Sequence, residues 1–213
     1  MPIPWNDDPP DAAARIRSNL ADLLRRLIDA ASDRVEPTVD LARGWHRDVY
    51  RGAPLPVDYY CGEIRNDDPR YPELVGYEVR VGPLPGLPSR DVPAALERFE
   101  TQMQRAVALL DDDVPVREPP RDPGTLGSVI TLCALAHGEW VRIHPFANGN
   151  GRTARLWANW SALRYGLPPF VRLRPRPEGL LYARAAADSM QGDHRATVDL
   201  FADWLHMQIL EGP

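Results

Sequence analysis

The sequence predicts a mostly helical domain with one small β-hairpin. Apolar residues recur at helical spacing along several long segments, whereas one short stretch alternates apolar and polar residues as a strand does. Prolines and glycines gather between these segments, where they favour turns and loops. Helices are expected over residues 11–31, 37–51, 92–110, 126–142, 151–163, 178–190 and 195–210, and the strand is expected over residues 75–81.

The N-terminal part of the chain is expected to be an appendage of the main domain. Residues 1–10 are rich in proline and predict a loosely held arm. The first helix after it carries an apolar stripe and places its arginines on the outer side. Pro37 suits the first turn of a second helix. We therefore predict an N-terminal arm and helix over residues 1–35 and the main domain over residues 36–213, which together form a single globular unit.

The strand and its turn form the single β-element of the prediction. Tyr77, Val79 and Val81 alternate with polar residues, and the run from Gly82 to Gly86 then reverses the chain. We call residues 75–86 the flap. From the sequence pattern, one interpretation is a structural hairpin that only covers the core.

The helix over residues 126–142 is expected to be the central one, because apolar residues dominate one face of it. Cys133 lies on that face and is interpreted as a small core residue. His137 shares the face, so a structural role is favoured over a catalytic one. The run from Asp111 to Asp113 is interpreted as a solvated helix end, because three consecutive side chains do not converge on one metal ion.

Composition narrows the function classes. All 25 basic residues are arginine, so no mechanism that needs a lysine nucleophile is available. The net charge of -5 argues against a nucleic-acid or anionic-membrane partner. The N-terminus lacks the apolar segment of a secretory signal, and no window approaches the roughly 18 apolar residues of a membrane span. We expect a cytoplasmic protein.

The segment from His144 to Arg155 combines several features of a phosphate site. Gly149 and Gly151 permit tight turns and close approach of a ligand. Backbone N–H groups in such a turn and at the start of the following helix bind anions. Arg152 and Arg155 supply bidentate donors suited to phosphate oxygens. His144 precedes this group and has an unshifted pKa near neutrality, so it is the candidate general base.

This segment resembles the signature of Fic-domain proteins, which reads His-Pro-Phe-x-Asp/Glu-Gly-Asn-Gly-Arg-x-x-Arg. It matches at every defined position except Asn148, where the family has an acidic residue. Flanking stretches are also similar, including residues 62–65 and residues 75–82. The resemblance extends over residues 36–208 and implies a Fic-type helical domain with the flap as its β-element.

The resemblance implies a protein adenylyltransferase, which moves AMP from ATP to a Ser, Thr or Tyr hydroxyl of a target protein with Mg²⁺ on the phosphates. His144 would be the general base, and Phe146 would be a buried residue that fixes the loop. The phosphates would bind at Gly149, Asn150, Gly151, Arg152 and Arg155. In this family the flap holds the target by strand addition, here through Tyr77, Val79 and Val81.

Asn148 departs from the family at the position that helps to hold Mg²⁺. An amide oxygen can coordinate this cation but brings no charge, so weaker metal binding is expected. Alternatives are therefore kept: transfer of UMP, phosphocholine or phosphate, removal of AMP, or a non-catalytic module that binds a nucleotide or a partner. Doc-type relatives, which phosphorylate, have lysine in place of Gly151, so its presence favours nucleotidyl transfer.

Many Fic proteins are inhibited by a glutamate that pairs with the second arginine of the signature, here Arg155. Glu36 and Glu211 each lie in a partial match to the inhibitory sequence, and chance explains either one better. A small antitoxin that supplies the glutamate is a further partner that the resemblance allows, as for a toxin-like protein. Adenine could contact Tyr182.

Overall fold

The structure, a computed structural model, describes residues 3–6 and 9–211, so part of the predicted arm lies outside the described residues. The described chain is mostly helical and has one two-stranded antiparallel sheet, as predicted. The helices are α1 (Pro10–Asp29), α2 (Val39–Val49), α3 (Val92–Asp113), α4 (Pro123–Ile143), α5 (Asn150–Arg164), α6 (Leu180–Met190) and α7 (Arg195–Glu211), and the strands are β1 (Arg80–Val81) and β2 (Leu84–Pro85).

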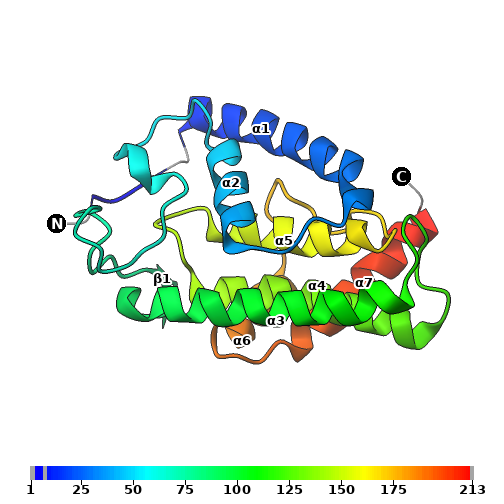
Figure 1. The fold of residues 1–213 in the computed structure, drawn as a ribbon. Coiled ribbons are helices and arrows are strands. Elements are labelled where there is room, and N and C mark those ends of the chain that lie inside the picture. Colours follow the sequence, from blue (N-terminus) through cyan, green and yellow to red (C-terminus); the bar gives the residue numbers. More distant parts are fainter. Residues whose placement is uncertain (1–2, 7–8, 212–213) are drawn as a thin grey trace.

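Helix α4 is central, as predicted, because it packs against α3, α5, α6 and α7. Figure 1 shows α1 and α2 on one side of α5 and the α3–α4 pair on the other, with α6 beyond α4. Aromatic rings fill the space between these helices. Trp157 of α5 lies 4.8 Å from Trp45 of α2 and 5.4 Å from Phe99 of α3, measured between ring centroids. Cys133 is fully buried in α4, which confirms it as a core residue.

Two helix starts differ from the prediction because of their caps. Helix α4 begins at Pro123, before the predicted residue 126, since the carboxylate of Asp122 accepts a hydrogen bond from the Thr125 N–H at 2.9 Å. Helix α2 begins at Val39 and not at Pro37, because the Thr38 hydroxyl caps it by accepting from the Leu41 N–H at 3.1 Å. Pro37 therefore precedes the helix.

Helix α5 is buried on nearly all sides. Arg155 and Asn159 are both buried. The amide of Asn159 donates to the Val171 carbonyl at 2.7 Å and accepts from the Val171 N–H at 3.0 Å. The polar residues of α5 thus bind the segment that follows the helix. Because other parts of the protein surround α5 on nearly all sides, the helix has no clear hydrophobic periodicity.

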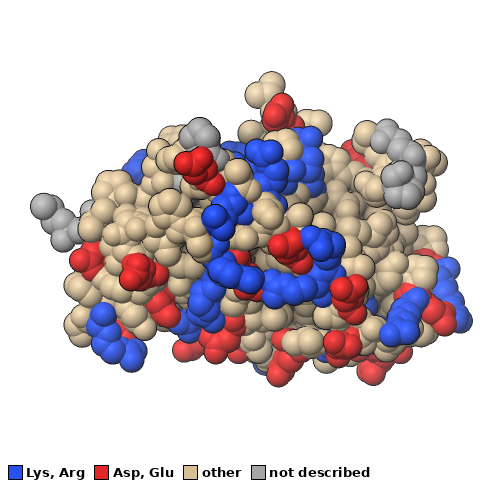
Figure 2. All heavy atoms as spheres, turned by 90° about the horizontal axis from the view of Figure 1, so that it is seen from above, with Lys and Arg blue, Asp and Glu red and all other residues tan. Residues whose placement is uncertain are grey.

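Helix α1 packs its apolar residues into the same core as the other helices, through Ile16, Leu20 and Leu23. The division of the chain at residue 35 stays a prediction. Figure 2 views the molecule from the α1 side, where arginine side chains run across the surface. The outward arginines of α1 are Arg15, Arg17, Arg25 and Arg26, as expected. No helix among the described residues is long and apolar enough to cross a membrane.

The flap is a shorter hairpin than predicted. Arg80 pairs with Pro85 and Val81 with Leu84. Val75, at the start of the predicted strand, is 39% exposed and forms only an isolated parallel bridge with Asn66. The alternation holds from residue 77 to 81, because Tyr77, Val79 and Val81 are partly buried and the residues between them are exposed. The paired segment is short because Pro85, one of the two residues of β2, lacks an N–H donor.

Candidate active site

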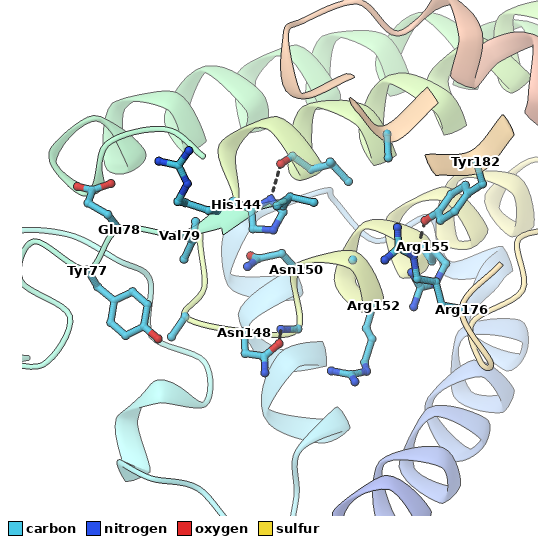
Figure 3. A pocket seen from close by; sticks show the side chains of 17 residues that line it. Tyr77, Glu78, Val79, His144, Asn148, Asn150, Arg152, Arg155, Arg176 and Tyr182 are labelled. Atoms are coloured by element: carbon cyan, nitrogen blue, oxygen red, sulfur yellow. Dashed lines mark hydrogen bonds between the residues drawn. The ribbon is translucent and has the colours of Figure 1, made fainter. Parts of the chain in front are cut away.

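A pocket of about 520 Å³ opens where the flap meets the loop between α4 and α5. We call residues 144–149 the motif loop. Flap residues 77–81 line one side of the pocket, and residues 147–152 line another. Arg155, Arg176 and Tyr182 close the end away from the flap (Figure 3). All the predicted site residues except Phe146 therefore line one pocket.

His144 is held in a defined tautomer at the end of α4. Its backbone is left-handed, with φ 52° and ψ 57°, and it ends the helix. Its Nδ1 lies 2.5 Å from the Val141 carbonyl oxygen, so Nδ1 carries the proton and donates it to that oxygen (Figure 3). Burial and the charge of Arg65 lower the pKa of His144 to about 4, although the bond to Val141 acts in the opposite direction. At neutral pH, Nε2 is therefore an unprotonated base.

Arg65 connects His144 to the flap. Its side chain is fully buried, and its guanidinium donates to four backbone carbonyls. These are His144 at 2.8 Å, Tyr77 at 2.7 Å, Leu87 at 2.9 Å and Ile143 at 3.2 Å. Burial lowers the pKa of Arg65 to about 10, and the nearby Glu78 carboxylate partly offsets this. Arg65 thus stays charged at neutral pH and positions the catalytic candidate and the flap together.

The motif loop is closed by its own residues and by α2. Phe146 is fully buried, as the resemblance implies, and stacks on the ring of His46 with 3.9 Å between centroids. The side-chain amide of Asn150 accepts from the Phe146 N–H and donates to the Phe146 carbonyl, both at 2.8 Å. His46 accepts from the Gly62 N–H at Nδ1, and its Nε2 lies 3.0 Å from the Asn148 carbonyl oxygen. The Asn150 side chain therefore holds the loop.

Gly149 is required where the motif loop enters α5. Its φ is +80°, and a Cβ atom would lie 2.6 Å from the Tyr50 hydroxyl. It precedes the first helical residues, whose N–H groups have no acceptor within the helix. The N–H groups of Asn150 and Gly151 are therefore directed at the pocket together with the positive end of the helix dipole. This arrangement can bind a phosphate group.

Asn148 makes two hydrogen bonds that do not fit a metal ligand. Its Nδ2 donates to the Trp5 carbonyl at 3.1 Å, and its Oδ1 accepts from the Gly149 N–H at 2.6 Å. Trp5 is buried and packs 4.5 Å from the ring of Tyr50. Among the described residues, no cluster of three potential metal-binding side chains occurs. The residues present do not form a protein-held Mg²⁺ site, because the Asn148 amide is committed to Trp5 and Gly149.

These bonds predict that Asn148→Asp destabilises the protein, although aspartate is the residue that the family signature contains. The carboxylate would face the Trp5 carbonyl oxygen without a donor, so we expect a loss of about 1–2 kcal/mol in the free energy of unfolding at pH 7. Urea unfolding followed by tryptophan fluorescence measures it. Asn148→Ala, which removes both bonds of the amide without burying a charge, should lose less. An aspartate variant as stable as the native protein would contradict the contact with Trp5.

The two arginines of the signature have different surroundings. Arg152 donates to the Tyr50 hydroxyl at 2.5 Å and lies partly exposed in the pocket. Arg155 is buried and donates to the Leu173 carbonyl at 3.1 Å and to the Tyr182 hydroxyl at 3.4 Å (Figure 3). Behind Tyr182, the buried His137 places its Nε2 3.1 Å from the same hydroxyl. His137 therefore supports the pocket without facing it, which fits its expected structural role.

The two candidate inhibitory glutamates do not approach Arg155 within the described part of the chain. Glu36 is exposed between α1 and α2. The Glu211 side chain lies outside the described residues. No described carboxylate forms an ion pair with Arg155, whose polar partners are a carbonyl and a hydroxyl. Inhibition from either glutamate stays untested.

Three pocket or supporting residues were not identified as functional from the sequence. Arg65 was noted only within a stretch that resembles the family, and its buried position is set by contacts far along the chain. Glu78 is one of the polar residues that alternate with the apolar flap residues, and it also lines the pocket. Arg176 lies in the connector between α5 and α6, outside the signature, and lines the pocket. The run of alternating arginines and prolines at residues 172–177 is the one signal that could have suggested an anion site.

More than half of the chain matches a known protein family. The sequence model of the Fic/DOC family matches residues 36–162. The chain belongs to the Fic/DOC family. The family assignment drawn from the segment between His144 and Arg155 is therefore confirmed, and the match extends over the flap and helices α2 to α4.

Individual relatives match over shorter stretches. The chain is 39% identical over 74 residues to the protein adenylyltransferase Fic of Drosophila virilis and to that of Drosophila melanogaster. These matches cover 35% of this chain and 15% of each relative, so the chain spans a small part of their length. A solved Fic domain containing signaling protein from Bacteroides thetaiotaomicron covers 90% of this chain and 66% of its own, with a TM-score of 0.57 and 18% identity. That likeness supports the fold.

Proposed function

We propose that this Fic/DOC protein transfers AMP from ATP to a hydroxyl group of a target protein. The observation that carries the proposal is that the Nε2 lone pair of His144 shares one pocket with the N–H groups at the start of α5. A base and a phosphate site are thus brought together beneath the flap. The Drosophila relatives named protein adenylyltransferase support the same reaction class.

In the proposed reaction, the target hydroxyl oxygen attacks the α-phosphorus of ATP. A new P–O bond forms, the bond between the α-phosphorus and the bridging oxygen breaks, and pyrophosphate leaves. His144 Nε2 takes the hydroxyl proton. The N–H groups of Asn150 and Gly151, together with Arg152 and Arg155, stabilise the charge on the phosphates. Phosphoryl chemistry of this kind depends mainly on positioning and charge, which these residues supply.

The flap is proposed to hold the target close to His144. A Cβ atom on Gly86 would lie 2.8 Å from Val79 and 3.1 Å from the His144 Cβ, so the flap passes directly beside the base. An extended target segment could add to the flap as a further strand and present its Ser, Thr or Tyr hydroxyl to Nε2. Tyr77, Val79 and Val81 would provide the side-chain contacts.

The experiment that tests the proposal is mass spectrometry of a cell lysate treated with the purified protein, ATP and Mg²⁺. We expect an adenylyl group on a hydroxyl residue of a target protein, present with native protein and absent with His144→Ala. A phosphate adduct would replace AMP transfer by phosphate transfer. Identical spectra for the native protein and His144→Ala would contradict transfer of any kind.

A second candidate, nucleotide binding without transfer, is favoured by one observation. Asn148 is bonded to Trp5 and brings no carboxylate to the pocket. If native protein binds ATP but modifies a target only after Asn148→Asp, this candidate replaces the first. Turnover by the native protein excludes it.

A further inference from the structure

Three arginines line the pocket, and two of them, Arg155 and Arg176, meet at the end away from the flap (Figure 3). Arg152 and Arg155 come from α5, and Arg176 comes from the connector between α5 and α6. Figure 3 shows Arg176 beside Arg155 and Tyr182. Among the described residues that line the pocket, the one carboxylate is that of Glu78, which belongs to the flap on the opposite side. The signature of the family accounts for two of these arginines and leaves the third unexplained.

Arg176 is held at the pocket by its neighbours. Its guanidinium carbon lies 5.7 Å from the centroid of the Tyr182 ring, within the range of a cation–π contact. Its backbone carbonyl accepts a hydrogen bond from Arg172 at 3.2 Å. Tyr182 is itself fixed by its contact with His137 and by packing 5.6 Å from the Trp204 ring. The side chain of Arg176 remains exposed to the pocket and to solvent.

The three like charges repel one another. Burial lowers the pKa of Arg155 most, and the charges of Arg152 and Arg176 lower it further. No carboxylate in the described part of the chain pairs with Arg155 or Arg176 to offset this. A cationic cluster of this kind is stabilised by an anion that several guanidinium groups share. The cluster therefore indicates a ligand with more negative charge than one phosphate carries.

The order of the groups along the pocket suggests which part of the ligand Arg176 meets. The N–H groups at the start of α5 lie next to His144, where the reacting phosphate must sit. Arg155 follows, but two of its guanidinium nitrogens are committed to the Leu173 carbonyl. Arg176 lies beyond it and has an exposed guanidinium. A chain of phosphates that starts at α5 and extends away from the flap reaches Arg176 last.

We infer that Arg176 binds the terminal phosphate of the nucleotide and makes the pocket select a triphosphate over a monophosphate. This inference rests on the proposed function, since it takes the ligand to be a nucleotide. The same side chain could instead stack on the base. A guanidinium binds a charged phosphate more strongly than it stacks on a neutral ring, so contact with the phosphate is favoured.

Calorimetric binding to tripolyphosphate, ATP and AMP tests the inference on native protein and Arg176→Ala. We expect Arg176→Ala to weaken tripolyphosphate and ATP roughly 10- to 100-fold, because a hydrogen bond to a charged group contributes about that much. AMP binding should change by less than about twofold, since one phosphate does not reach Arg176. Arg176→Lys keeps the charge and loses the bidentate geometry, so its affinity for tripolyphosphate and ATP should lie between those of the native protein and Arg176→Ala.

Arg184→Ala is the matched control. Arg184 is an exposed arginine of α6 that does not line the pocket, so its loss changes net charge equally and should leave all three affinities unchanged. Equal weakening of AMP and ATP would assign Arg176 to the base and overturn the inference, as would unchanged binding of tripolyphosphate. These readouts do not require transfer. A protein that shows the expected binding pattern but modifies no target would refute the proposed function and leave the role of Arg176 intact.

Discussion

Arg65→Met is expected to lower the free energy of unfolding by about 3–5 kcal/mol. Methionine fills a similar volume but cannot donate to the carbonyls of His144, Tyr77, Leu87 and Ile143. Buried carbonyls that lose their donor keep the cost of desolvation, and several lose it together here. Urea unfolding followed by tryptophan fluorescence measures the change. The His144 backbone and the flap would separate, so target modification should fall in parallel.

Two variants separate this effect from a general loss of charge. Arg70→Met removes an arginine of the same loop whose side chain is 78% exposed and paired with Asp68, so we expect a much smaller change in the free energy of unfolding. Glu78→Gln removes the carboxylate 3.6 Å from Arg65 but leaves the four hydrogen bonds to the carbonyls in place. Its effect on the free energy of unfolding should therefore also be small. If Arg65→Met is no more destabilising than Arg70→Met, the carbonyl bonds do not hold the site together.

The helices could be predicted from the sequence where one face meets water. Helix α3 has a regular apolar stripe, since its other side is solvated, and the stripe predicts it well. Helix α5 could not be predicted in the same detail, because Asn159 and Arg155 are buried and satisfied by residues 171 and 173. When only the sequence is known, polar residues whose partners lie elsewhere in the chain are interpreted as exposed to solvent.

The candidate site likewise has one part that the sequence predicts and another part that it does not. The part between His144 and Arg155 is contiguous, so its phosphate chemistry could be predicted from residue types and spacing. Arg65 and Arg176 reach the same pocket from distant loops, and their roles depend on where the chain folds back. Asn148 shows a third case. Its chemistry suggested a weak metal ligand, whereas a contact with Trp5, 143 positions away, gives its amide another partner.

The transfer rate is expected to keep its plateau down to about pH 5, well below the range of an ordinary histidine. A general base acts when it is deprotonated, and the pKa of His144 is lowered from 6.5 to about 4, mainly by burial. At pH 5.5 about 97% of His144 would then be unprotonated, against about 9% for an unshifted ring. The rate of AMP transfer, measured from pH 4 to 8 at low ATP, should fall with a midpoint near pH 4.

The control is the stability of the protein over the same range. Because the folded pKa of His144 lies below the unfolded value, the unfolded state binds more protons between about pH 6.5 and 4. Stability therefore falls as the pH drops through this window and levels off below it, so circular dichroism must show folded protein at each point. AMP transfer by His144→Ala should be about 10²- to 10⁴-fold slower at pH 7, and its rate should not show the fall at acid pH that protonation of His144 causes. A midpoint near pH 6.5 in the native protein would show that the ring is solvated during turnover, and that the buried geometry beside Arg65 is not the one that reacts.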